Sequence, residues 1–217
     1  MLVVCRTDTD PKAGAKAFSI LIVEDGMAGF ERGRNLEKMG MKAQDTSELF
    51  FNDVKVPKGN LLGEAGMGFI YLMRELPQER LSIAVSAVAA CEAVIQETVK
   101  YVKQRAAFGK TIADFQHTQF KLAELEAEVT VMRVFIDRCA ELLVKKELST
   151  VEASKAKLLA TELQGKVTDQ CVQMHGGYGY MWEYPVARAY ADARVQRIYG
   201  GTSEVMKLII GRDLLAD

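Results

Sequence analysis

The spacing of hydrophobic and polar positions changes close to Gly63. Before it, apolar residues gather in short runs rich in β-formers, residues 17–23 and 48–56, and turn residues close each run. Two or three strands do not make a stable sheet without further strands or a packing partner. Residues 1–62 therefore predict part of a β-barrel or β-sandwich domain.

Beyond Gly63 the apolar positions recur with a helical period. Candidate helices cover residues 67–76 and 77–105, and a proline is tolerated where the second begins. In residues 116–146 the apolar stripe that is typical of helical bundles consists of Leu122, Leu125, Val129, Met132, Ile136, Cys139 and Leu143. In residues 150–175 it consists of Ala156, Leu159, Leu163, Val167, Cys171 and Met174.

Capping signals complete the predicted architecture. The glycine pair 176–177 ends the third long helix, and shorter helices are expected at 184–194 and 203–215, the last capped by Thr202 or Ser203. The fold class is therefore mainly α. A helical bundle domain, residues 63–217, is expected to follow the partial β-domain.

Composition excludes several classes of function. The 28 Lys and Arg residues balance 29 Asp and Glu, so no charge excess marks a nucleic-acid or anionic-membrane partner. We expect no membrane span and no signal peptide. Cys91, Cys139 and Cys171 fall in helical patterns, as buried small hydrophobes do, which indicates a reducing compartment. His117 and His175 lack helical spacing, so no metal site is expected.

Three glycine-containing segments carry the candidate chemistry: 105–110 (RAAFGK) with Gln116, 173–180 (QMHGGYGY) and 198–205 (IYGGTSEV). Each alone admits a structural interpretation, as a helix-end cation, a turn or a cap. Together, in this order and with the run Asp-Val-x-Val-Pro at 53–57, they resemble the acyl-CoA dehydrogenase family over essentially the whole chain. The resemblance implies a C-terminal helical bundle of that type, an FAD cofactor and a homo-oligomer, dimeric or tetrameric.

The resemblance also implies roles for individual residues. Arg105 and Phe108 would hold the pyrophosphate and adenine of a neighbouring subunit's FAD, and Thr202 and Glu204 would contact FAD at the last helix. Four further residues would share the first of these sites: Gln116, Gln173, Gly176 and Gly177.

The reaction implied by the resemblance removes the α-proton of a fatty acyl-CoA and passes the β-hydrogen as hydride to flavin N5, giving a trans-2-enoyl-CoA. Most family members place the basic carboxylate just before the Gly-Thr of the third segment, where this chain has Gly200. The long-chain and isovaleryl branches place it on an earlier helix, at the position of Glu79. Glu79 is therefore the predicted base, although a first-turn surface glutamate is the alternative interpretation. Glu75 does not match the family position, and Glu204 more naturally serves the last helix.

Arg80, Gly200 and Gly201 are the predicted substrate-binding residues, with the Gly200 N–H and a flavin ribityl hydroxyl as donors to the thioester oxygen. The sequences of the motifs resemble the long-chain branch most, so a medium- to long-chain acyl-CoA is expected as substrate. The resemblance also implies an electron-transferring flavoprotein as electron acceptor. The compartment would be the mitochondrial matrix in a eukaryote and the cytoplasm in a bacterium. Two alternatives stay open: a truncated, non-catalytic helical oligomerisation fragment, and a related acyl-CoA oxidase.

Overall fold

Helices dominate the structure, a computed structural model that describes residues 1–216. They are α1 (Gly68–Gln104), α2 (Gln116–Val144), α3 (Thr150–His175), α4 (Pro185–Ala193) and α5 (Ser203–Leu214). Short 3₁₀ segments connect them, among them η4 (Gly176–Tyr180) and η5 (Arg194–Arg197). The mainly α fold class is confirmed, and α2 and α3 begin where the sequence places them.

Two antiparallel strand pairs occupy the first compact unit, residues 1–38 and 42–76. β1 (Leu2–Arg6) pairs with β2 (Phe18–Ile22), and β3 (Phe30–Asn35) pairs with β4 (Ser47–Phe51). β2 coincides with the first predicted β-rich run, whereas β4 covers only the first part of the second, residues 48–56. β1 and β3 were not predicted, and β3 consists mostly of polar residues.

The second compact unit comprises residues 39–41 and 77–217, and the division between the units falls inside α1. The two helices expected on either side of Pro77 are one continuous helix. The break was a wrong inference: proline removes one intrahelical hydrogen bond but leaves its neighbours helical here. The domain boundary expected after residue 62 stays a prediction.

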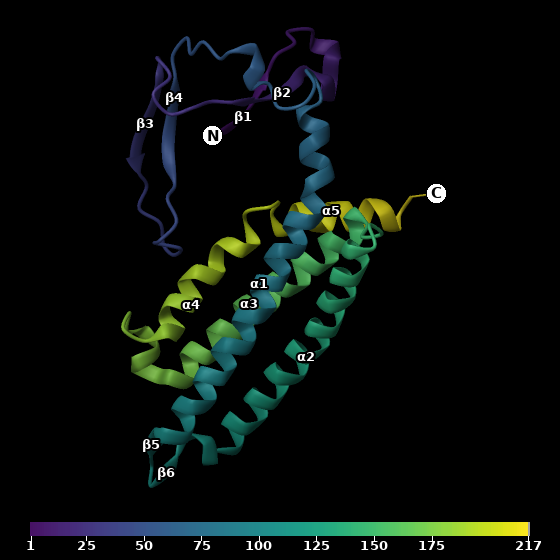
Figure 1. Ribbon diagram of the computed structural model, residues 1–217. Coiled ribbons are helices and arrows are strands. Elements are labelled where there is room, and N and C mark those ends of the chain that lie inside the picture. Colours follow the sequence, from purple (N-terminus) through teal and green to yellow (C-terminus); the bar gives the residue numbers. More distant parts are fainter. Residues whose placement is uncertain (217) are drawn as a thin grey trace. The chain divides into compact units, whose positions relative to one another are not determined.

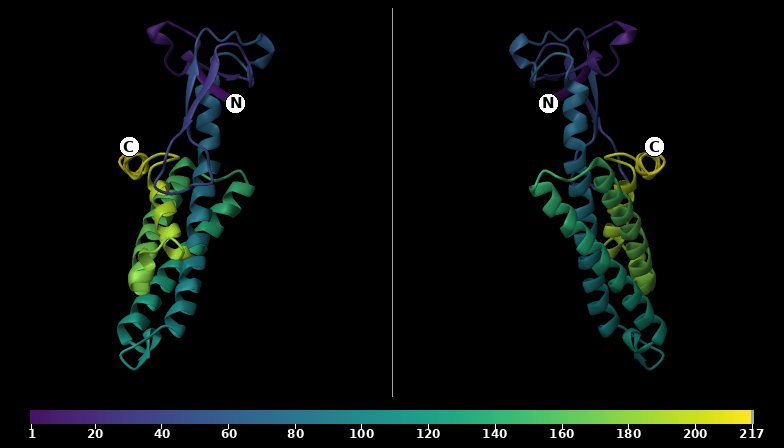
Figure 2. Two further views of the ribbon diagram at one scale, coloured as in Figure 1. Left: turned by 90° about the vertical axis from the view of Figure 1, so that its left-hand side faces the viewer. Right: turned by 90° about the vertical axis from the view of Figure 1, so that its right-hand side faces the viewer.

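The core of the second unit lies between α1, α2 and α3, which run side by side (Figures 1 and 2). Its fully buried members include Val88 of α1, Val129 of α2 and Ala160 of α3. The three helical cysteines are completely buried free thiols, as their positions in the apolar stripes predict. The predicted stripe of α3 is partly wrong, because Leu159 is 49% exposed.

Both ends of α3 are fixed by local interactions. Ser149 and Glu152 form a capping box, in which the Glu152 N–H donates to Ser149 Oγ at 3.1 Å and the Ser149 N–H donates to Glu152 Oε2 at 3.2 Å. At the other end Gly176 adopts a φ of 58°, which ends the helix at the predicted residue.

A small hairpin and α5 lie at opposite ends of the bundle (Figure 1). The hairpin, β5 (Ala106–Ala107) and β6 (Lys110–Thr111), joins α1 to α2. This arrangement places the three predicted motifs at the two ends of the bundle.

Among the described residues, α1 has the length and apolarity that a membrane span requires. Leu81, Ala84, Val88 and Cys91 of this helix are buried in the bundle core. Packing against α2 and α3 thus accounts for the apolar character of α1.

Candidate functional site

A cleft of about 770 Å³ opens at the hairpin end of the bundle. Arg105, Gln173, Gly176 and Gly177 line it, so the structure brings four of the six residues predicted for the neighbouring subunit's FAD together. The Arg105 guanidinium lies 5.5 Å from the centre of the Tyr178 ring, a cation–π distance. We call this the hairpin-end cleft.

The other two residues predicted for this site lie beside the cleft and do not line it. Phe108 sits at the tip of the hairpin with a φ of 52°, and its side chain is 95% exposed. Gln116 is exposed at the first position of α2. Phe108 thus has a free aromatic face, which is what a stacking contact with a further group requires.

The hairpin-end cleft fits part of a dinucleotide. A Cβ added at Gly176 or Gly177 would meet no atom within 4 Å, so a ligand can approach the backbone there. Tyr101 and His175 stack with their ring centres 4.1 Å apart on the wall of the cleft. A guanidinium beside stacked rings and open backbone suits a pyrophosphate attached to a nucleobase.

The third motif forms a loop at the opposite end of the bundle, residues 198–202 between η5 and α5, which we call the glycine loop. Gly200 and Gly201 have φ values of 62° and 102°, in the region that favours glycine. Arg80 of α1 is buried and donates from Nε to the Gly200 carbonyl at 3.3 Å. Burial lowers the pKa of the Arg80 guanidinium, and the neighbouring Glu79 carboxylate acts in the opposite direction.

A second buried cation also holds this loop. Lys157 of α3 is fully buried and donates from Nζ to the Gly201 carbonyl at 2.7 Å. Burial and the nearby Arg80 lower the pKa of the Lys157 ammonium, while Glu162 and Glu204 raise it. Consecutive carbonyls are therefore held by cations from two different helices.

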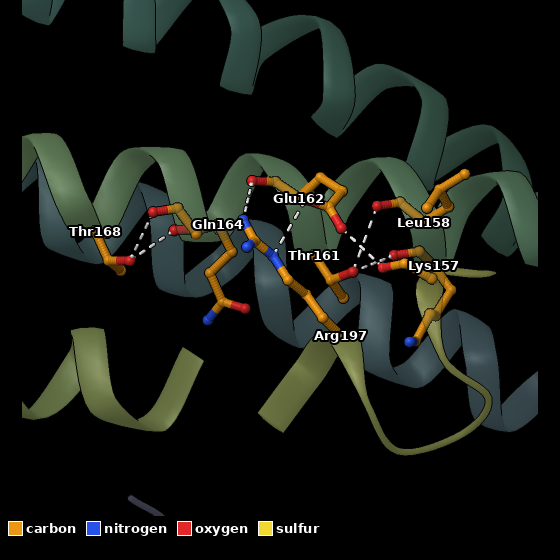
Figure 3. Close-up of polar contacts among 9 residues, drawn as sticks. Lys157, Leu158, Thr161, Glu162, Gln164, Thr168 and Arg197 are labelled. Atoms are coloured by element: carbon orange, nitrogen blue, oxygen red, sulfur yellow. Dashed lines mark hydrogen bonds and ion pairs between the residues drawn. The ribbon is translucent and has the colours of Figure 1, made fainter. Parts of the chain in front are cut away.

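The ends of the glycine loop are attached to Glu162 of α3. Arg197 in η5 pairs with Glu162 at 3.2 Å, and Ser203 Oγ donates to the other carboxylate oxygen at 2.7 Å (Figure 3). A Cβ at Gly165 would lie only 2.0 Å from Arg197 Nη2, so this glycine makes room for the arginine.

The remaining predicted residues lie on α1 and at the start of α5. Glu79 is exposed on α1, immediately before Arg80. Thr202 caps α5, with its hydroxyl accepting from the Val205 N–H at 3.3 Å, and Glu204 is exposed in the first turn. A hydrogen bond from its own backbone N–H and one from the Thr202 hydroxyl lower the pKa of Glu204.

Two separate groups of predicted residues thus occur in one chain. Arg80 and Arg105 are separated along α1 by about 37 Å at 1.5 Å per residue. The structure brings Arg80, Gly200, Gly201 and Thr202 together at one end, and Arg105 with the residues of the hairpin-end cleft at the other. This separation agrees with the expectation that the two ends serve different cofactor molecules.

Two residues near these groups were not singled out from the sequence: Tyr101 and Lys157. Lys157 had a readable signal, because it falls in the buried row of α3 formed by Ala153, Ala160, Gln164, Val167 and Cys171 at steps of three and four. A lysine in such a row is unusual unless it is paired. The stacking of Tyr101 on His175 had no sequence signal, because it joins residues 74 positions apart.

Within residues 1–216 no group of three or more His, Cys, Asp or Glu is arranged to hold a metal ion. The structure therefore offers a cleft with an arginine that can bind an anion, and a glycine loop held by the buried cations Arg80 and Lys157. The Glu79 carboxylate belongs to the residue next to Arg80. These features define a helical-bundle domain with the elements of a flavoprotein.

Comparison with known proteins places this domain. Residues 66–215 match the family description "Acyl-CoA dehydrogenase, C-terminal domain". The mitochondrial long-chain specific acyl-CoA dehydrogenase of Mus musculus is 56% identical over 217 residues, which is 100% of this chain and 50% of that protein. The short-chain specific acyl-CoA dehydrogenase of Megasphaera elsdenii is 41% identical over 207 residues, 95% of this chain and 54% of that protein.

Solved structures agree with the sequence matches. The crystal structure of an acyl-CoA dehydrogenase from Geobacillus kaustophilus superposes with a TM-score of 0.96 at 49% identity, covering 99% of this chain and 57% of that one. The chain belongs to the acyl-CoA dehydrogenase family, whose enzymes are FAD-dependent flavoproteins. It spans about half the length of the curated relatives it matches.

Proposed function

We propose that this chain belongs to an enzyme that oxidises a medium- to long-chain fatty acyl-CoA to the trans-2-enoyl-CoA, with Glu79 as the general base. The observation that carries the proposal is the hydrogen bond from Arg80 Nε to the Gly200 carbonyl. It ties the residue beside Glu79 to the loop position where most family members carry their base. The turn of α1 that carries Glu79 is therefore linked to the same loop through Arg80.

The geometry at Gly200 supports a base elsewhere than in the loop. Its φ of 62° strains any side chain, and an added Cβ would approach Ile83 Cδ1 to 2.5 Å. A glutamate at position 200 would bear both costs in this backbone conformation. Glu79 supplies a carboxylate from a helix, without that strain.

Each residue then has a defined task. The Glu79 carboxylate takes the α-proton, and the electron pair of that C–H bond moves toward the thioester carbonyl. The Gly200 N–H donates to the thioester oxygen as negative charge develops on it, and the buried Arg80 adds positive charge nearby. FAD, when bound, supplies the acceptor for the β-hydrogen as hydride.

The cofactor residues would be divided between subunits. Arg105, Phe108, Gln116, Gln173, Gly176 and Gly177 would grip the dinucleotide part of a neighbour's FAD, and Thr202 and Glu204 would contact the chain's own. A homo-oligomer follows from this arrangement, with an electron-transferring flavoprotein as electron acceptor. The mouse relative is named as mitochondrial, so the matrix is the proposed location if the source is eukaryotic, and the cytoplasm if it is bacterial.

Anaerobic visible spectroscopy tests the proposal. Addition of a saturated long-chain acyl-CoA should bleach the flavin of the loaded protein, and Glu79→Gln should slow bleaching by about 10²–10⁴-fold, the range for a general base. Glu75→Gln, another exposed carboxylate of α1, is the matched control and should bleach normally. Unchanged bleaching in Glu79→Gln would exclude it as the base.

A second candidate is a helical assembly module without catalysis. Val131, Val134 and Val144 of α2 are strongly exposed, as an unpartnered interface is. A colourless oligomer that does not retain added FAD would favour this candidate. Rapid oxygen uptake on bleaching would instead indicate an oxidase.

A further inference from the structure

Lys157 is a buried charge that the proposed mechanism leaves without a task. Its side chain is 0% exposed, and none of the salt bridges within residues 1–216 involves it or Arg80. Lysine is almost never fully buried without a charged partner, because removing an ammonium from water is costly. Packing of α3 would be served as well by an apolar side chain of the same length.

The contact that Lys157 makes is specific. Its side chain leaves α3 toward the loop that precedes α5 (Figure 3), and Nζ reaches the Gly201 carbonyl at 2.7 Å. Arg80 holds the preceding carbonyl, that of Gly200, and its Nη1 also donates to Ser154 Oγ at 3.4 Å. Two neighbouring peptide units thus have their oxygens fixed independently.

Fixing a carbonyl oxygen also fixes the N–H of the next residue. The peptide unit is planar and trans, so the N–H points opposite to the C=O. Arg80 therefore sets the direction of the Gly201 N–H, and Lys157 sets that of the Thr202 N–H. Two consecutive glycines at positive φ have few conformational restraints of their own, so these bonds select one arrangement.

We propose that Lys157 is a positioning residue that, together with Arg80, fixes the peptide planes of the glycine loop at the site where substrate and cofactor meet. Its positive charge is stabilised by the Gly201 carbonyl and by the Glu162 and Glu204 carboxylates, and it would favour negative charge that develops beside the loop during the reaction. The catalytic part of this inference rests on the proposed function, whereas the structural part does not.

Amide hydrogen exchange tests the structural part without reference to activity. In Lys157→Met, the amides of Val205 and Met206, which donate to Thr202 of the glycine loop, should exchange about tenfold faster, because the charge-assisted hydrogen bond that holds the adjoining peptide unit is lost. Exchange in the core of α1 and α2 should be unchanged. Lys155→Met, an exposed lysine on the same helix, is the matched control and should leave the loop unaffected.

Kinetics test the catalytic part. Lys157→Met in the flavin-loaded protein should lower kcat by up to about a hundredfold, the effect of a small misplacement of reacting groups, with KM little changed. Lys157→Gln keeps a donor without the charge and should restore most of the exchange protection and, with it, most of kcat. These variants keep a side chain of similar length at position 157.

The outcomes separate the two parts. Loop exchange equal to that of the parent protein, or faster exchange throughout the bundle, would overturn the positioning role. Selective loop exchange in a protein whose parent never bleaches would refute the proposed function and leave the positioning role standing. Selective loop exchange with an unchanged kcat would overturn the catalytic part alone.

Discussion

Substitution of Gly200 by alanine tests whether position 200 rejects a side chain, on which the placement of the base at Glu79 depends. An alanine forced into the left-handed region costs about 1–2 kcal/mol. Reduced freedom of the unfolded chain offsets about 0.4–1 kcal/mol of this cost. The new Cβ also meets Ile83 Cδ1 at 2.5 Å, with no other atom within 4 Å.

The steric part of the cost of Gly200→Ala can be measured separately, because it comes from one methyl group, Ile83 Cδ1. Overpacking costs about 1–3 kcal/mol, and the lower half applies here since the end of an isoleucine side chain can shift. We therefore expect Gly200→Ala to lower the free energy of unfolding by about 2–3 kcal/mol. Ile83→Val, at a half-buried position, should cost only about 0.5 kcal/mol.

The double variant Ile83→Val with Gly200→Ala tests whether the contact between these two positions causes the steric cost. Without Cδ1, the cost of Gly200→Ala should fall to the backbone part, so the coupling between positions 83 and 200 should be about 1–2 kcal/mol. Urea unfolding followed by circular dichroism gives all four free energies, provided that the m-values agree. Gly177→Ala is the control, since Gly177 has no positive φ and open space around it, and should be nearly neutral.

Additive effects, within about 0.3–0.5 kcal/mol, would refute the steric argument. A cost of Gly200→Ala no larger than that of Gly177→Ala would refute the strain argument as well. In that event position 200 would accept a side chain, and the case for Glu79 would rest on family resemblance alone.

Two further perturbations test the local physics of the bundle. Ser149→Ala removes the capping bond that Ser149 Oγ accepts from the Glu152 N–H, while the backbone N–H of residue 149 can still donate to Glu152. It should cost about 1 kcal/mol in thermal unfolding, whereas Ser149→Thr should cost little; equal melting temperatures for the three proteins would contradict this role. Burial raises the pKa of the Cys91 thiol to about 12, and burial also raises the pKa of Cys139 and Cys171. Because unfolded thiols ionise near pH 8.5, the folded state binds more protons above that pH. Cys91 should therefore lower stability by about 1.4 kcal/mol per pH unit from there up to about pH 12, and Cys139 and Cys171 act in the same direction. Burial lowers the pKa of Lys157, so this lysine changes stability with pH in the opposite direction. The dependence of stability on pH should therefore be compared between the parent and Cys91→Ala, which lacks one of the three thiol contributions.

The sequence alone determined the helical bundle and its local boundaries. Steps of three and four along α2 mark a face that can be buried only by another helix, and Ser149 and the glycine pair at 176–177 supply the ends of α3 through bonds between near neighbours. The motifs were equally visible, because each lies within twelve residues. Interactions between residues close in the chain can be recognised in the sequence because both partners fall within one short segment.

Tertiary structure decided what depends on distant residues. The bond from Lys157 to the Gly201 carbonyl and the stacking of Tyr101 on His175 both join segments far apart in the chain. The sequence placed Arg80 and Gly200 in separate motifs 120 positions apart, and only the fold brings Nε within 3.3 Å of the carbonyl. A hydrogen bond of that kind depends on where whole helices lie, and no periodicity in the chain records it.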